Sequence, residues 1–383
     1  MSEFRVNNLS NESDSGGPTF SGITTFSSPY FFVPPVGNTQ DRPDDPVIGD
    51  LRFNTDVLCL EYYKGDSIGW AQVTAVKATG PGPNSGFTGF IAGANDPSPW
   101  SPYNNIDYIT ITTMGNSADF GDLEVAKTGK QTIANKNRIL FPGGYAGGGY
   151  QQAISYNNIQ SKGNGSDFGD LIQVKAGASC VANNTRGLVG QSGDQNASPY
   201  ATNIIESVAI QTTGNTADFG DATSEKGSAT GMNSSTRGIW GAQDNSPAKL
   251  VYTTISTLGN TQDFGTYSQH PNSGACNSTR GIWAGSYFNN SMGYTTIATL
   301  GDVTDFGDLV VARFAPGGAS SPTRGVIIGG KSIPSQYVIN TMDTVQLMTL
   351  GNAVDFGDIS YMSSETDYTA EAFTGSNGHG GVY

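Results

Sequence analysis

Apolar residues stand at alternate positions in several short stretches of this chain, for example at residues 108–113, 207–213 and 344–350. A period of two places Ile109 and Ile111 on one face of a β-strand and the hydroxyl residues between them on the other. Few windows have the apolar spacing that a helix of ten or more residues needs. The pattern therefore predicts an all-β chain built from many short strands.

A second pattern recurs six times along the chain. The stretch "GNSADFGD" at residues 115–122 returns with small changes, and the central phenylalanines of its copies are Phe120, Phe168, Phe219, Phe264, Phe306 and Phe356. Successive copies are 42 to 51 residues apart, which is the spacing of four-stranded propeller blades. Asp-Phe-Gly also holds magnesium in protein kinases, but a catalytic loop is needed once and the other kinase motifs are missing. The repeat predicts a structural period.

Each repeat divides into four predicted strands: a small-residue stretch such as 227–235, a Thr-Arg-Gly segment, an alternating segment and the Asp-Phe-Gly motif. The second strands carry Arg138, Arg186, Arg237, Arg280 and Arg324. We expect each motif phenylalanine to fill the gap between adjacent blades, where burial stabilises by about 1.5 to 3 kcal/mol. The Gly-Asn before the motif predicts a tight turn in which both residues accept positive φ. The motif aspartates are expected to cap turn amides or to pair with the arginines.

The two ends of the repeat region differ from its middle. The first unit, at residues 86–96, is short and has no arginine, and residues 368–383 begin a seventh unit that stops early. If the last strand completes the first blade, no sheet edge stays exposed. We therefore predict a β-propeller over residues 78–383, with six blades closed by the C-terminal strand. Seven blades remain the alternative.

Two segments precede the repeats. Residues 1–47 are polar and without period, apart from the apolar island at 29–35, which predicts an extended arm that is either disordered or ordered against a partner. Residues 48–77 contain two strand-like runs around "YKGDSIG", with Leu58, Leu60 and Trp70 as apolar residues, which predicts a β-hairpin module. A single hairpin is marginal in water. Both segments are therefore expected to dock on another subunit or on the propeller.

Composition narrows the classes of function. The net charge of −14 disfavours nucleic acid as a partner because phosphate binding needs clustered Lys and Arg. No window approaches the roughly 18 apolar residues of a membrane span, so no membrane insertion is expected. The cysteines Cys59, Cys180 and Cys276 form no ligand pair, and the last two are expected to be buried small residues. These features favour a soluble protein that folds in a reducing cytoplasm.

Candidate chemistry is sparse. The histidines, His270 and His379, are too few for a copper site and are expected in solvent. The Asp-x-x-Asp spacing could attract calcium, but it lacks the further carboxylates of an EF-hand, and Thr266 interrupts it. Nucleophile-elbow, zinc and phosphate-loop motifs are missing. We therefore expect no enzymatic activity, cofactor or metal.

Loops between the predicted strands carry aromatic residues beside Asn and Ser. Aromatic faces with amide donors suit sugar rings, so these loops could bind glycans, although ordinary turn composition explains them as well. Their aromatic residues are Trp100, Tyr103, Tyr200, Tyr287 and Phe288.

Two passages resemble known proteins. The segment "GDLRFNTDVLCLEYYKGDSIGWAQV" resembles the hairpin near the start of tailed-bacteriophage fibre and neck proteins. The opening residues and the "TRGIWGA…TISTLGNTQDFG" units resemble kelch-like virion proteins of phages that infect marine cyanobacteria. The resemblance implies a kelch-like propeller in a non-catalytic structural component of a virion tail, neck or fibre, assembled in the host cytoplasm.

The same resemblance implies the partners. Residues 1–75 would bind other virion proteins, and the propeller would be displayed outward for protein contacts. A homotrimer would fit a fibre-like appendage, although the sequence has no heptads. The alternative function is a receptor-binding adhesin that recognises host-surface glycans through the propeller loops.

Overall fold

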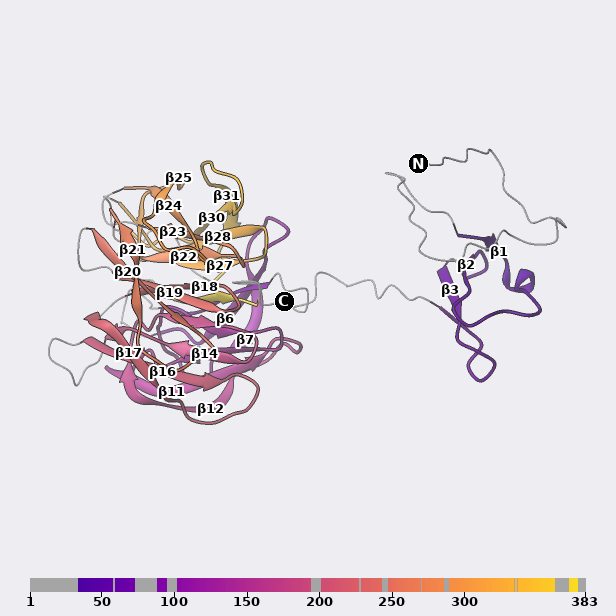
Figure 1. Ribbon diagram of the computed structural model, residues 1–383, viewed down its shortest axis with the longest axis horizontal. Coiled ribbons are helices and arrows are strands. Elements are labelled where there is room, and N and C mark those ends of the chain that lie inside the picture. The colour runs from indigo at the N-terminus through magenta and orange to yellow at the C-terminus, as the bar shows by residue number, and fades with distance from the viewer. Residues whose placement is uncertain are drawn as a thin grey trace. The chain divides into compact units, whose positions relative to one another are not determined.

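The computed structural model divides into two compact units, Met1–Ala78 and Thr79–Tyr383, which are described separately (Figure 1). Within the described residues the chain is all-β, with a single 3-10 turn at Thr39–Asp41. No helix in that part is long and apolar enough to cross a membrane. The structure describes residues 34–57, 59–72, 88–94, 102–193, 201–226, 229–242, 247–269, 271–285, 289–333, 335, 337–361 and 372–377.

Unit 1 contains one four-stranded sheet, in the order β1-β2-β3-β4. Its strands are β1 (Val36–Gly37), β2 (Leu51–Asn54), β3 (Cys59–Tyr63) and β4 (Trp70–Gln72). The predicted hairpin corresponds to β3 and β4, and two further strands extend it. The chain reverses after β2 because the Asn54 side chain accepts the Asp56 N–H at 2.9 Å. Strand β1 comes from the predicted arm and pairs in parallel with β2. Residues 1–33 of that arm lie outside the described residues.

Unit 2 contains six larger antiparallel sheets, here numbered 1 to 6 in chain order. Sheet 1 consists of β32 (Ala372–Ser376), β5 (Thr88–Gly93), β6 (Asn105–Thr110) and β7 (Ala118–Asp122). Sheet 2 consists of β8 (Ile133–Ala134), β9 (Arg138–Pro142), β11 (Gly149–Asn158) and β12 (Ser166–Lys175), with β10 (Tyr145–Ala146) beside β11. Sheet 3 consists of β13 (Cys180–Ala182), β14 (Arg186–Val189), β16 (Ala201–Ala209) and β17 (Ala217–Lys226), with β15 (Ser192–Gly193) beside β16.

The remaining three sheets each have four strands, paired in the order in which they occur in the sequence. Sheet 4 consists of β18 (Ala229–Asn233), β19 (Arg237–Ala242), β20 (Ala248–Thr254) and β21 (Gln262–Tyr267). Sheet 5 consists of β22 (Ser273–Cys276), β23 (Arg280–Ala284), β24 (Ser291–Thr296) and β25 (Thr304–Asp308). Sheet 6 consists of β27 (Gly317–Ser320), β28 (Arg324–Ile328), β30 (Thr341–Gln346) and β31 (Val354–Asp358), with the short pair β26 (Arg313–Phe314) and β29 (Lys331–Ser332) nearby in sequence.

The first strands of the six sheets contact one another in a cycle. Strand β32 lies against β8, β8 against β13, β13 against β18, β18 against β22, β22 against β27, and β27 against β32. The C-terminal strand β32 pairs with β5 in antiparallel register, with Thr374 opposite Ile91. Sheet 1 is therefore built from both ends of unit 2, and β5 has a partner on each side.

The motif strand of every sheet contains a β-bulge. In sheet 1, Ile106 lies opposite Gly121 and Asp107 opposite Asp119, so Phe120 between them has no partner in the ladder. The same shift occurs in the other five sheets. A bulge bends its strand and turns the extra side chain out of the regular alternation. The bulge thus points each motif phenylalanine toward the neighbouring sheet.

Candidate functional site

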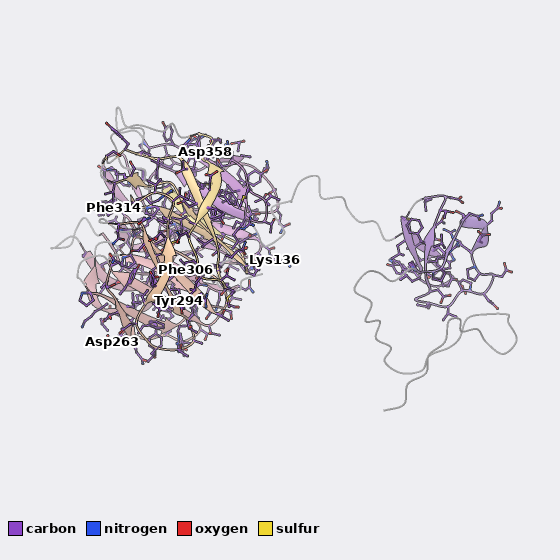
Figure 2. The ribbon with its side chains drawn as sticks, turned by 90° about the horizontal axis from the view of Figure 1, so that it is seen from above. Lys136, Asp263, Tyr294, Phe306, Phe314 and Asp358 are labelled. Carbon is purple, nitrogen blue, oxygen red and sulfur yellow. The ribbon has the colours of Figure 1, made fainter. Side chains whose placement is uncertain are left out.

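The six motif phenylalanines lie in six separate apolar clusters. Each ring is at most 3% exposed. Each cluster draws residues from two consecutive sheets, and the last one joins sheet 6 to sheet 1 through Phe356, Ile109 and Ile111. In sheets 1, 2, 4 and 5 the ring also packs edge-on against a tyrosine of its own sheet, as Phe306 does with Tyr294 at 6.3 Å between centroids (Figure 2). The phenylalanines therefore hold sheets together and do not line a common pocket.

The turn before each motif docks onto the preceding sheet. In every sheet the turn glycine donates its N–H to the carbonyl of the preceding sheet's motif phenylalanine, at 2.7 to 3.0 Å. The junction between sheets 6 and 1 follows the same rule, with Gly115 bonded to Phe356. These hydrogen bonds form a second closed cycle, independent of the contacts between the first strands.

The turn prediction is correct for glycine and wrong for asparagine. The six turn glycines have φ between 144° and 157°, a region that favours glycine. The asparagines keep negative φ and act through their side chains instead. Asn260, for example, accepts the N–H of Asp221 in the preceding sheet at 2.9 Å, and Asn116, Asn215 and Asn352 do the same in their sheets.

The repeated arginines bind backbone oxygen in the next sheet. Each one donates from Nη1 to a carbonyl at 2.9 to 3.2 Å, and the acceptors are Ile210, Ile255, Ile297, Leu347 and Ile111. Several guanidinium groups also stack on a tyrosine of their own sheet, as Arg237 does on Tyr252 at 4.5 Å. The expected pairing with motif aspartates is wrong for these contacts. Each guanidinium instead reaches the carbonyl of the first residue after the third strand of the next sheet.

Sheet 1 replaces its missing arginine with a lysine from sheet 2. Lys162 lies over the Tyr108 ring at 4.4 Å and donates to the Asp119 carbonyl at 3.2 Å. A cation thus joins sheets 1 and 2, as one does at the other junctions. Here the cation belongs to the later sheet of the pair, whereas the arginines belong to the earlier one. Because Lys162 stands next to the turn glycine, sequence comparison of the arginine strands alone does not reveal it.

Of the predicted glycan contacts, Tyr103 alone lies within the described residues. Tyr103 is half-buried, packs against the cluster between sheets 6 and 1, and meets the Tyr361 ring at 5.9 Å. Part of its ring is therefore covered by protein. The other four predicted contacts lie outside the described residues, as do His270 and His379: they are Trp100, Tyr200, Tyr287 and Phe288.

A small cavity of about 40 Å³ lies among the first strands of the six sheets. Gln131 closes one side, because its amide donates to the Gly231 carbonyl at 2.9 Å and accepts the Gly231 N–H at 2.8 Å. Cys180 and Cys276 line the cavity and are buried with free thiols. Burial raises the pKa of the Cys180 thiol, so it is held as the unreactive acid. The cavity has room for a few water molecules and for little else.

The part of the chain that the structure describes contains no group of three or more His, Cys, Asp or Glu side chains positioned to hold an ion. The first aspartate of each motif copy is exposed to solvent at the edge of its sheet, apart from the other copies.

Three buried cations lie five residues after the last residue of a motif copy, a feature the sequence reading missed. Lys175 pairs with Glu206 at 3.2 Å, and Arg313 with Asp343 at 2.8 Å. Lys127 occupies the equivalent place between sheets 1 and 2, but the strand position that holds the acid elsewhere is Ser155 there. A basic residue five positions after several motif copies is visible in the sequence and could have indicated these buried cations.

Lys127 is therefore a buried amine, and no described residue places a carboxylate in ion-pair contact with it. Its Nζ donates to the carbonyls of Phe141 at 2.8 Å and Ala153 at 3.3 Å, and it lies 5.5 Å from the centroid of the Phe373 ring. Burial lowers the pKa of Lys127 to about 7, with a small opposing effect from Glu124. A neutral amine has two N–H donors, and two carbonyls receive them.

We predict that the free energy of unfolding rises between pH 7 and 9 through Lys127. Its pKa is lower in the folded than in the unfolded chain, so the unfolded chain binds more protons in this range and rising pH favours folding. The slope approaches about 1.4 kcal/mol per pH unit for this one group. Denaturant titrations of the wild type and Lys127→Met at both pH values measure it. A wild-type rise equal to that of the variant would contradict the assignment.

No protein-family model matches the sequence, and no curated protein matches it either.

Proposed function

We propose that unit 2 is a six-bladed kelch-like β-propeller and that the chain is a non-catalytic structural component of a tailed-phage virion. The propeller assignment is supported by two closed cycles, one of strand contacts and one of turn hydrogen bonds. The virion assignment is supported by the resemblance of the hairpin segment and the repeats to phage fibre, neck and kelch-like proteins. In this proposal unit 1 attaches the chain to the particle, and the propeller serves protein contacts.

One observation carries the attachment role: the sheet of unit 1 buries the face that holds its charged and amide side chains, together with Tyr63 and Trp70. Strands β2 and β3 place Arg52, Asn54 and Glu61 on one side, and all three are at most 5% exposed. Glu61 binds Arg42 at 2.6 Å and Asn54 at 3.1 Å, and the Arg42 hydrogen bond holds the pKa of Glu61 below its ordinary value. The segment that carries Arg42 thus covers this face of the sheet.

The opposite face is apolar and open. Leu51 lies beside Tyr62, and Phe53 lies between Val36 and Leu60. Val36 is 59% exposed and Leu51 41%, and among the described apolar residues of unit 1 only Tyr63 is buried. A solvated sheet normally buries its apolar face and exposes its polar one. The reversed arrangement is expected of a sheet that a partner completes.

The test is incorporation into phage particles. Particles are assembled with the full chain, with Val36→Glu plus Leu51→Glu, or with Ile68→Glu, and their protein content is measured by mass spectrometry. Ile68 is a matched control because it is 66% exposed but lies in the turn between β3 and β4. We expect the wild type and the control in the particles and the double variant in the supernatant.

The other outcomes separate the two parts of the proposal. Absence of the wild-type chain from purified particles would disprove the virion role. Equal incorporation of all three chains would keep that role and place the attachment outside this sheet face.

A further inference from the structure

The residue before the turn glycine forms an apolar arc on unit 2. It is Met114 in sheet 1, Leu258 in sheet 4, Leu300 in sheet 5 and Leu350 in sheet 6, and each of these side chains is 56% to 66% exposed. Sheets 4, 5, 6 and 1 follow one another in the cycle of contacts. Sheets 2 and 3 have Lys162 and Thr213 at the same position. The turn itself therefore does not require an apolar residue.

The arc is most developed at the junction between sheets 6 and 1. A groove of about 160 Å³ is lined there by Met114, Leu350 and Val354, with Gln346 and Arg324 beside them. Val354 is 52% exposed. A contiguous group of exposed apolar side chains is rare on a soluble protein unless something binds it, and methionine adapts to the shape of a partner. The groove can receive one apolar side chain.

Charge around the groove indicates what kind of partner fits. The exposed Asp355 directly follows Val354, which lines the groove. The guanidinium of Arg324 donates to the Ile111 carbonyl and stays half-buried. A partner with lysine or arginine beside its apolar side chain would therefore complement the surface. Two copies of this chain meeting through the arc would bring aspartates together, which disfavours self-association.

We propose that this arc, Leu258–Leu300–Leu350–Met114 with the groove at its end, is a docking surface for another protein, which inserts an apolar side chain flanked by Lys or Arg. The proposal rests on the virion role above, and it adds the face of the propeller and the chemistry of the partner. It also explains why the apolar residues occupy consecutive sheets and are missing from the other two.

The test uses a photoreactive benzoylphenylalanine in the full chain within assembled particles. It is placed at position 350 or 300 in the arc, or at position 213, the same turn of sheet 3, as the matched control. Thermal melts first establish that the three variants fold alike, which is expected because all three positions are in turns. After irradiation, cross-linked peptides are identified by mass spectrometry.

We expect cross-links to one other particle protein from positions 350 and 300, and loss of that product at position 213. The attached peptide should contain an apolar residue within two positions of Lys or Arg. Cross-links to a second copy of this chain, equal yields at position 213, peptides without a basic residue, or no product at 350 would each overturn the proposal. If the chain is missing from the particles, the virion role itself is wrong. The protein content of the particles shows this, so it is distinguished from every cross-linking outcome.

Discussion

Gly220→Ala is expected to destabilise unit 2 by at least about 3 kcal/mol. Gly220 has φ of 143°, and a Cβ on it would lie 2.6 Å from the carbonyl carbon and oxygen of Gly259 in the next sheet. An alanine must therefore push the turn of sheet 4 away. That movement breaks the bonds from Gly259 to Phe219 and from Asp221 to Asn260, each 2.9 Å long. Chemical denaturation of the full chain measures the loss.

Gly259→Ala is the matched control for that experiment. Gly259 has φ of 147°, but a Cβ there would meet nothing within 4 Å. The control therefore carries the backbone strain without the collision, and we expect it to be more stable than Gly220→Ala by about 2 kcal/mol or more. Equal losses in the two variants would show that the sheets do not approach each other closely at this junction.

Removal of residues 372–383 is expected to abolish the cooperative unfolding of unit 2. The deletion removes β32, leaves an edge of β5 unpaired, and takes Phe373 out of a cluster in which it is 1% exposed. It also removes the acceptors of the Gly318 and Ser320 N–H groups, the side chains of Thr374 and Ser376. Loss of a buried Phe costs about 3 to 5 kcal/mol, and each orphaned donor about 1 to 3 kcal/mol. The sum is comparable to the whole stability of a domain.

A synthetic peptide of residues 366–383 added to the truncated chain provides the control. The intact peptide should restore a cooperative thermal transition, followed by circular dichroism. A peptide with Phe373→Ala should bind about a hundredfold more weakly, which corresponds to about 3 kcal/mol. A truncated chain that melts like the wild type without peptide would contradict the pairing of β32 with β5.

The repeat could be read from the sequence because its signals are local. A fixed interval, an alternating strand and a Gly before each motif depend only on neighbouring residues, and the structure has strands at those places. The contacts between sheets could not be read in the same way. Whether Arg237 meets a carboxylate or the Ile297 carbonyl depends on how consecutive sheets are offset, and no single repeat contains that information.

Substitutions that break the repeat were harder to interpret. Lys162 supplies the cation that the arginine position of sheet 1 lacks, but it lies on the other side of the junction. Lys127 has Ser155 at the strand position where Lys175 and Arg313 have a carboxylate. In unit 1 the sequence predicts the hairpin, whereas the burial of its polar face follows from the ion pair between Arg42 and Glu61, residues in different segments. Each of these features depends on a contact between residues that lie in different segments of the chain.

A crystal structure of the full chain would show how consecutive sheets meet. We expect six sheets around one axis, with Ala372–Ser376 beside Thr88–Gly93, the Gly115 N–H on the Phe356 carbonyl, and one motif phenylalanine wedged at every junction. The C-terminal strand paired elsewhere, or the six rings gathered in one pocket or exposed to water, would contradict this expectation.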